Sequence, residues 1–321
     1  MKNGEEIKKE ISVVIPLFNE AESIRELYQK LKKVLTKTEK RYEIIFIDDG
    51  SRDNSFSALE ELYNQDKNVK VIQFRRNFGK SAALDAGFQS AQNEIVITMD
   101  ADLQDGPEEI PKFIAKLEEG YDLVCGWRVK RKDRFSKKIS SIIFNKITSF
   151  LTGNKIHDIN CGFKAYRREV IDNIRVYGEL HRFIPVLVQW QGFRVGEIEI
   201  VNHSRKYGKT KFGPMRFLSG FFDLLTTLFI TKYTTKPLHF FGFVGLILFL
   251  CGMSIDLFLV VWKYTNGLVV STGRPLLALI LGVFLMLTGL QFFSIGFLGE
   301  IIIHTSSRKK SNYTIRNILE G

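Results

Sequence analysis

The chain has 321 residues, of which 45% are hydrophobic, and it carries a net charge of +11. This length and composition suit one substantial domain plus a smaller part, and they exclude a disordered or fibrous protein. The three cysteines lie far apart without CxxC spacing, which excludes a zinc-finger or disulfide framework and indicates a reducing compartment. A basic protein can bind nucleic acid, but no RNA- or DNA-binding motif is present, so we expect no nucleic-acid partner.

Apolar, β-branched runs alternate with helical patterns along the first hundred residues. The runs typical of strands cover residues 11–16, 42–47, 69–74 and 94–99, and the helical patterns cover residues 20–35, 55–64 and 81–91. This alternation predicts an α/β fold with a mainly parallel sheet and helices on both faces.

Polar side chains follow three of these strands. They are Asn19 and Glu20 after the first strand, Asp48 and Asp49 after the second, and Asp100, Asp102 and Gln104 after the fourth. Ligands of open α/β sheets bind beyond the carboxyl ends of the strands. Three polar strand ends on one edge therefore predict a binding site rather than solvated loops.

The fourth strand ends in the sequence IVITMDADLQD at residues 95–105. Its acids could face a metal, a basic side chain or solvent. Asp100 and Asp102 point the same way if the chain stays extended, and carboxylates are the ligands that Mg²⁺ and Mn²⁺ prefer. Asp105 precedes Gly106-Pro107 and a helical run, so we expect it to cap that helix.

Glycine-rich phosphate loops are missing from the sequence. No GxGxxG follows the first strand, and Gly79-Lys80-Ser81 lacks the glycine five residues earlier that a P-loop requires. If the site takes phosphates, a divalent cation must therefore neutralise much of their charge.

Two segments combine basic and apolar residues. Residues 128–138 (RVKRKDRFSKK) precede an apolar helical pattern that runs to residue 151, and the basic loop 204–213 precedes another at 212–233. Both patterns fit interfacial helices on a membrane. An ordinary surface helix and a solvated loop remain the alternatives.

Two long apolar stretches, at about 238–262 and 275–303, predict a transmembrane hairpin. Their connection holds only Lys263 and Arg274, whereas lysines and arginines flank both outer ends, so the positive-inside rule predicts cytoplasmic termini. The N-terminus lacks the apolar core of a signal peptide. We expect an integral inner or plasma membrane protein with a cytoplasmic catalytic part; two buried helices of a soluble protein are the alternative. Asp256 and Glu300, inside the stretches, should face another helix or the interface.

Ordered motifs carry a family resemblance. They are VVIPLFNE (13–20), DDGSRDNS (48–55), RNFGKSAALDAG (76–87), MDADLQDGPE (99–108), NCGFKAYRRE (160–169), HRFIP (181–185) and SRKYGKTKFG (204–213). Together they resemble the membrane-linked family 2 glycosyltransferases that charge a polyprenyl phosphate with one sugar, such as dolichol-phosphate mannose synthases and bacterial polyprenyl-phosphate glucosyltransferases. The resemblance runs from about Ile11 to Ile303.

The resemblance implies a GT-A nucleotide-diphospho-sugar transferase domain at 1–211, with a membrane-facing segment at 128–151. Juxtamembrane helices at 212–237, the hairpin at 238–303 and a cytoplasmic C-terminal arm at 304–321 would follow. In relatives that arm can pair with a neighbouring subunit, so Tyr313-Thr314-Ile315 is a strand candidate, and a homo-oligomer is expected, with a tetramer as the candidate state.

The resemblance also assigns residues to roles. The nucleotide-sugar site would comprise Pro16, Phe18, Glu20, Asp48, Asp49, Lys80, Asp100, Ala101 and Asp102. The metal, Mg²⁺ or Mn²⁺, would be held by Asp100, Asp102 and Gln104. The lipid phosphate would meet Arg128, Arg131, Arg134, Arg205 and Lys211. The residues expected to act in catalysis are Asp100, Asp102, Arg128, Asp158, Arg205 and Lys211. Phe18 replaces a common Tyr and Cys161 a common Ser or Thr. Asp158 could orient the acceptor, support an arginine or cap a turn. His181 and Arg182 could reach substrate or pack structurally, and a structural role is favoured for the histidine.

The expected reaction is inverting, metal-dependent transfer of one sugar from a nucleotide-diphospho-sugar donor to polyprenyl phosphate, undecaprenyl or dolichyl, among membrane lipids. A UDP-sugar is favoured, and GDP-mannose is possible. The alternatives are a non-catalytic membrane scaffold and a transferase with another lipid acceptor. A processive polysaccharide synthase would carry a QxxRW motif, and residues 189–194 read QWQGFR instead.

Overall fold

The computed structural model describes residues 10–129, 156–204, 206–207, 237–266, 273–305 and 315–319, without side chains for 266, 303–305 and 315–319. They divide into two compact units. The first comprises residues 1–227 with 311–321, and the second comprises residues 228–310.

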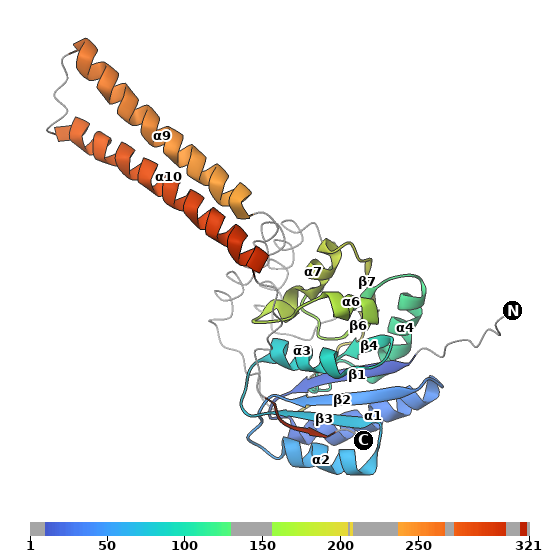
Figure 1. The fold of residues 1–321 in the computed structure, drawn as a ribbon. Coiled ribbons are helices and arrows are strands. Elements are labelled where there is room, and N and C mark those ends of the chain that lie inside the picture. The colour runs from blue at the N-terminus through green and yellow to red at the C-terminus, as the bar shows by residue number, and fades with distance from the viewer. Residues whose placement is uncertain are drawn as a thin grey trace. The chain divides into compact units, whose positions relative to one another are not determined.

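The first unit opens with alternating strands and helices, coloured blue to cyan in Figure 1. Its elements up to the fourth strand are β1 (Ile11–Leu17), α1 (Ala21–Lys37), β2 (Tyr42–Asp48), α2 (Ser55–Gln65), β3 (Val69–Phe74), α3 (Lys80–Ser90) and β4 (Ile95–Thr98). The expected alternation is confirmed, and each element begins and ends within about two residues of the prediction.

The remaining described elements of this unit include four strands that extend the sheet at both edges. They are η1 (Pro107–Glu109), α4 (Ile110–Glu118), β5 (Leu123–Arg128), β6 (Lys164–Arg167), α6 (Arg168–Asn173), η2 (Leu180–Phe183), α7 (Ile184–Trp190), β7 (Val195–Ile200) and β8 (Ile315–Leu319).

The eight-stranded sheet has the order β7-β5-β6-β4-β1-β2-β3-β8. Strands β4, β1, β2 and β3 form a continuous parallel block, and β6 and β8 run antiparallel to their neighbours. The mainly parallel sheet is thus confirmed. Pro16 lies in the central strand β1, beyond the last β1–β4 pair at Val14 and Thr98, so its missing N–H interrupts no bond to β4.

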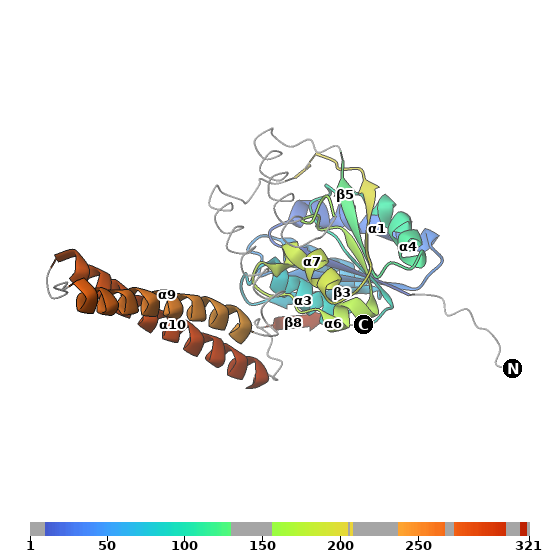
Figure 2. The same cartoon turned by 90° about the horizontal axis from the view of Figure 1, so that it is seen from above.

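Both faces of the sheet are covered because alternate residues of its central strands point to opposite sides. Val13 and Ile15 of β1 pack with α1, α2 and α4, whereas Val14 packs with α3, α6 and α7. Figure 2 shows α1 and α4 on one side of the sheet and α3, α6 and α7 on the other. The carboxyl ends of the parallel strands therefore open onto loops between two packed layers.

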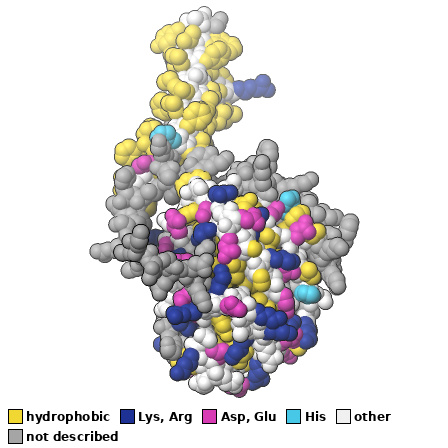
Figure 3. All heavy atoms as spheres, turned by 90° about the vertical axis from the view of Figure 1, so that its right-hand side faces the viewer, with side chains coloured by type: hydrophobic (Ala, Val, Ile, Leu, Met, Phe, Trp, Pro, Cys, Tyr) yellow, Lys and Arg dark blue, Asp and Glu magenta, His cyan; other side chains and the backbone are white. Residues whose placement is uncertain are grey.

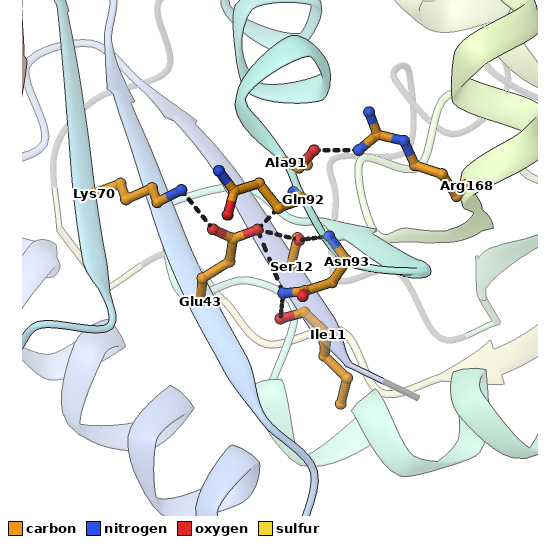
Figure 4. A network of polar contacts seen from close by, with 8 residues as sticks. All are labelled: Ile11, Ser12, Glu43, Lys70, Ala91, Gln92, Asn93 and Arg168. Carbon is orange, nitrogen blue, oxygen red and sulfur yellow. Dashed lines mark hydrogen bonds and ion pairs between the residues drawn. The ribbon is translucent and has the colours of Figure 1, made fainter. Parts of the chain in front are cut away.

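The amino-terminal ends of the central strands hold a polar network around Glu43, which is 8% exposed (Figure 4). Its carboxylate accepts hydrogen bonds from the Ser12 hydroxyl at 2.5 Å and the Gln92 N–H at 2.8 Å, and it pairs with the Lys70 ammonium at 3.0 Å. The Asn93 amide donates to the same carboxylate at 3.3 Å. A buried charge with this many partners is compensated, and it ties the starts of β1, β2 and β3 to the loop before β4.

The second unit is a hairpin of two helices, α9 (Pro237–Asn266) and α10 (Gly273–Thr305). Both are long and apolar enough to cross a membrane, with mean hydropathy of 2.5 and 2.4 over their best windows. Apolar side chains cover most of the visible hairpin surface in Figure 3, whereas the visible face of the first unit mixes apolar, basic and acidic side chains. The predicted pair of apolar helices is present.

The two hairpin helices approach closely at glycines. A Cβ at Gly289 of α10 would lie 2.5 Å from the carbonyl oxygen of Gly245 of α9, and the reverse contact is equally short. The carboxylate of Asp256 lies against Gly282, and that of Glu300 accepts the Leu238 N–H at 3.5 Å. Both acids therefore face the neighbouring helix, as expected for charged groups in an apolar segment.

The C-terminal strand β8 pairs antiparallel with β3, from Val71 opposite Leu319 to Phe74 opposite Ile315. A strand in the C-terminal arm was expected from Tyr313-Thr314-Ile315. It starts at Ile315 and pairs within its own chain; Tyr313 and Thr314 lie outside the described residues.

Candidate active site

Residues 100–105 after β4, which we call the acidic loop, alternate between buried and accessible side chains. Ala101, Leu103 and Asp105 are buried, and the predicted metal ligands Asp100, Asp102 and Gln104 are half-buried. The loop is not extended throughout, because Leu103 has φ +60 and the Gln104 N–H donates to Asp102 Oδ1 at 3.2 Å. The turn keeps the side chains of all three predicted ligands accessible. Ala101 can meet a ligand only through its backbone, because its side chain belongs to the core.

Asp100 forms an ion pair with Lys80, the first residue of α3. Burial would raise the pKa of Asp100, but the ammonium of Lys80, together with Arg128 and Lys164, outweighs it and lowers the pKa. Gly162 leaves room for this carboxylate, since a Cβ there would lie 2.6 Å from Asp100 Oδ2. A metal, a basic side chain and solvent were the three partners considered for these acids. In the structure, Asp100 pairs with a basic side chain.

Asp105 does not cap the following helix, so that prediction is wrong. Gly106 is the N-cap of η1 and Glu109 that of α4, and neither helix has a side-chain cap. Asp105 is 2% exposed, forms an isolated β-bridge with Asn202 and accepts the Asn202 amide at 3.4 Å. Burial raises the pKa of Asp105, and the nearby Arg128 partly offsets the rise. The acid fastens the acidic loop to the chain after β7.

Arg128 ends β5 and is held by Asp158. Its Nε donates to Asp158 Oδ2 at 2.9 Å and its Nη2 to Oδ1 at 3.5 Å, while the side chains are 16% and 3% exposed. Of the three roles left open for Asp158, the geometry matches support of an arginine. Such a pair orients the rest of the guanidinium for an anion.

The acids after β2 hold neighbouring loops. Asp49 accepts the N–H groups of Phe78 at 2.7 Å and Gly79 at 2.9 Å, and burial raises its pKa to about 6. Asp48 accepts the Ser51 N–H at 2.9 Å, and burial raises its pKa as well. The two bonds of Asp49 position the loop that leads into α3 and Lys80, and the bond of Asp48 closes the turn after β2.

The chain after β1 is tied to the same loops. The Asn19 N–H donates to Ser51 Oγ at 2.8 Å, the Arg52 N–H donates to Asn19 Oδ1 at 2.8 Å, and the Glu20 N–H donates to Ser55 Oγ at 3.0 Å. Phe18 and Glu20 are half-buried at this edge, whereas Pro16 is buried in β1. The predicted nucleotide-binding residues therefore gather at adjacent strand ends.

Two further residues also lie here: Lys164, which sequence reasoning did not single out, and His181, for which a structural role was favoured over substrate contact. His181 of η2 places Nδ1 2.9 Å from Ser81 Oγ, next to Lys80, and Lys164 donates to the carbonyl of Cys161. HRFIP and NCGFKAYRRE contain these residues, but nothing in their spacing indicates contact with α3 or with Asp100. Cys161 and Cys125 are buried, which raises the pKa of each thiol to about 12, so both are neutral core side chains.

The predicted lipid-phosphate residues other than Arg128 lie outside the described part of the chain. They are Arg131, Arg134, Arg205 and Lys211, and most of the two amphipathic segments lies there too.

The acidic loop fits a divalent cation. Asp100 already binds a cationic group, Asp102 and Gln104 present further oxygen atoms, and the missing side chain at Gly162 keeps space beside Asp100. Oxygen donors are the set that Mg²⁺ and Mn²⁺ prefer. Among the described residues, no three His, Cys, Asp or Glu side chains are placed to share an ion, so the Gln104 amide or a ligand oxygen must complete the shell.

Comparisons with known proteins give one family match and nearly full-length similarity to individual relatives. Residues 12–175 match glycosyl transferase family 2. The chain is 36% identical over 318 residues to a dodecaprenyl-phosphate galacturonate synthase of Rhizobium johnstonii, covering 97% of this chain and 93% of the relative. It is 37% identical over 322 residues to an undecaprenyl-phosphate 4-deoxy-4-formamido-L-arabinose transferase of Proteus mirabilis, covering 99% and 96%.

Solved structures match the first unit's fold. Glucosyl-3-phosphoglycerate synthase of Mycobacterium tuberculosis, crystallised with Mn²⁺, UDP and glucosyl-3-phosphoglycerate, has a TM-score of 0.52 at 17% identity. The match covers 70% of this chain and 80% of that one. A complex of the same enzyme with Mn²⁺, UDP and phosphoglyceric acid gives 0.53. The expected GT-A fold is thereby confirmed.

Proposed function

The chain belongs to glycosyl transferase family 2, and from this premise we propose that it transfers one sugar from a nucleotide-diphospho-sugar to polyprenyl phosphate. The observation that carries the proposal is the nearly full-length similarity to two relatives named as polyprenyl-phosphate enzymes, hairpin included. A UDP-sugar is the favoured donor because the solved neighbour binds UDP with Mn²⁺, and GDP-mannose is the second candidate.

Residues of the first unit would share the work of binding. Loops after β1 and β2, with Glu20 and Asp49, would take the nucleoside. Asp100, Asp102 and Gln104 would hold Mg²⁺ or Mn²⁺, which supplies positive charge to the departing diphosphate. Lys80 stands at the same point with a charge of its own.

The reaction would proceed with inversion at the anomeric carbon. An oxygen of the lipid phosphate forms the new C–O bond, and the electron pair of the old bond leaves with the nucleoside diphosphate. The second pKa of a phosphate monoester is about 6, so the lipid phosphate is largely dianionic at neutral pH and needs no strong general base. Arg128, oriented by Asp158, would bring the two anions together, with the four basic residues outside the described range.

The hairpin would anchor the enzyme so that catalysis takes place at the cytoplasmic face. Helices α9 and α10 supply the length, and the lysine and arginine distribution supplies the orientation. The pairing of β8 within one chain leaves the homo-oligomer a proposal based on the resemblance.

A transfer assay tests the proposal. Purified protein receives a panel of labelled nucleotide sugars, polyprenyl phosphate and Mg²⁺ or Mn²⁺, and label entering the lipid phase is counted. We expect one donor to be used, a chelator to abolish transfer, and Asp102→Asn to reduce the rate by a factor on the order of 10² or more.

Asp172→Asn is the matched control, because Asp172 is an exposed acid on α6 that pairs with Arg168 on the same helix. It should leave the rate unchanged. Tight nucleotide binding without transfer from any sugar would favour the non-catalytic scaffold, and transfer to a different lipid would favour the other alternative.

A further inference from the structure

His181 and Ser81 are far apart in sequence but bonded twice. The His181 N–H donates to Ser81 Oγ at 3.2 Å, and His181 Nδ1 lies 2.9 Å from the same oxygen. Ser81 is 1% exposed and is the second residue of α3, directly after Lys80. Helix η2 is thus fastened to the first turn of the helix that presents Lys80.

The bonding pattern favours one tautomer of the ring. Ser81 Oγ accepts the backbone N–H, and its hydrogen can be donated to His181 Nδ1, which lies 2.9 Å away. Donation in this direction places the ring proton on Nε2. Burial, followed by the charges of Lys80, Arg182 and Lys164, lowers the pKa of His181 well below its ordinary value, in agreement with this neutral form.

Lys80 depends on this first turn for its position. Its ammonium reaches Asp100, whose carboxylate lies over Gly162 without room for a side chain there. The preceding residue, Gly79, has φ +92, so the backbone turns sharply into the helix, and Asp49 holds its N–H at 2.9 Å. Ser81 is the next fixed point along the chain.

We propose that His181 is a positioning residue: by accepting the Ser81 hydroxyl it holds Lys80 against Asp100 before the metal arrives and beside the donor diphosphate during transfer. The second half of the statement rests on the proposed function. The first half does not, because it concerns the ion pair of the ligand-free chain. His181 lies outside residues 12–175, which match the family.

The test compares two replacements of His181. His181→Asn keeps an acceptor oxygen near the position of Nδ1, whereas His181→Leu has similar bulk and no acceptor. Both keep the backbone N–H bond to Ser81. Lys80→Ala and the double variant Lys80→Ala/His181→Leu complete a cycle, and Gln189→Ala on the exposed side of α7 is the control.

The first readout is Mn²⁺ affinity of the full-length protein in detergent, without donor or lipid, from the free-ion signal in electron paramagnetic resonance. Lys80 competes with Mn²⁺ for Asp100, so Lys80→Ala should bind the ion ~3–10-fold more tightly. His181→Leu should shift affinity in the same direction, His181→Asn should match wild type, and the double variant should match Lys80→Ala.

The second readout is kcat/KM for transfer. His181→Leu should lower it ~10-fold in the wild-type background and leave it unchanged in the Lys80→Ala background. Additive effects of the two changes, or equal behaviour of His181→Leu and His181→Asn, would overturn the proposal. A chain that binds no Mn²⁺ would overturn it together with the metal assignment.

The two readouts separate this proposal from the proposed function. If the Mn²⁺ affinities of the variants follow the expected pattern but no sugar is transferred, the positioning of Lys80 stands and the transferase is refuted. If sugar is transferred and His181→Leu behaves like wild type in both readouts, the transferase stands and the positioning role of His181 is refuted.

Discussion

The pairing of Arg128 with Asp158 changes how the basic residues of the site are understood. An arginine expected to meet phosphate is anchored from behind by a carboxylate that is 3% exposed. Sequence could supply the candidates, because the family resemblance assigns both residues to the site. It could not choose among three roles for Asp158, because that choice depends on which strand ends meet.

We predict that Asp158→Ala destabilises the first unit by about 3–5 kcal/mol, because it leaves the Arg128 charge largely buried without its partner. Thermal unfolding in detergent measures the loss. The double variant Asp158→Ala/Arg128→Met should regain part of it.

The exposed pair of Arg168 and Asp172 is the control, since its loss should cost no more than about 1 kcal/mol. Equal losses at the two pairs would contradict the buried role of Asp158.

Asp49 predicts a pH dependence with a definite sign. Its pKa is about 6 in the folded chain, against 3.8 as the ordinary value. Between about pH 4 and 6 the folded state therefore holds a proton that the unfolded state has released, and stability falls as the pH rises through this window. The 2.2-unit difference sets a limit of about 3 kcal/mol.

Melting temperatures from pH 4.5 to 7.5 check this prediction. Relative to Asp49→Asn, wild type should lose stability as the pH rises to about 6 and then run parallel to the variant. Parallel curves over the whole range would show that Asp49 does not titrate in this window.

At the scale of elements, alternation of β-branched runs and amphipathic helices was enough to predict β1 to β4 with their helices, because nearly every residue of each run is buried between two layers. The helix cap assigned to Asp105 failed for a physical reason. Asn202, 97 residues further along the chain, supplies a buried partner, and a local sequence pattern cannot reveal a contact of that separation.

The contact of α9 with α10 leads to a prediction for the hairpin. Gly289→Leu would place a side chain where Gly245 O now lies, 2.5 Å from the new Cβ. We expect a loss of about 1–3 kcal/mol from overpacking, seen as a lower unfolding temperature of the full chain in detergent.

Leu290→Ala provides the comparison for that change, since Leu290 is 56% exposed. If both variants melt alike, close helix approach at the glycines is not what holds the hairpin together.

At the scale of the whole molecule, charge distribution predicts the orientation in the membrane. Lys232 and Lys236 precede the hairpin and Arg308 to Lys310 follow it, against two basic residues in the connection. A phosphatase reporter that is active only outside the cytoplasm should work when inserted at residue 269 and stay inactive at residue 321. The reverse pattern would refute the cytoplasmic assignment.

The return of β8 to β3 has a consequence for how the protein is made. Strand β3 is complete once Phe74 has been synthesised, yet within the described part of the chain its outer edge is paired by residues 315–319. On the ribosome, both apolar helices are therefore translated before the sheet can close. An exposed strand edge invites pairing with other chains. The nascent first unit thus carries an open strand edge throughout translation of the hairpin, and β8 can close that edge only after both helices have been made.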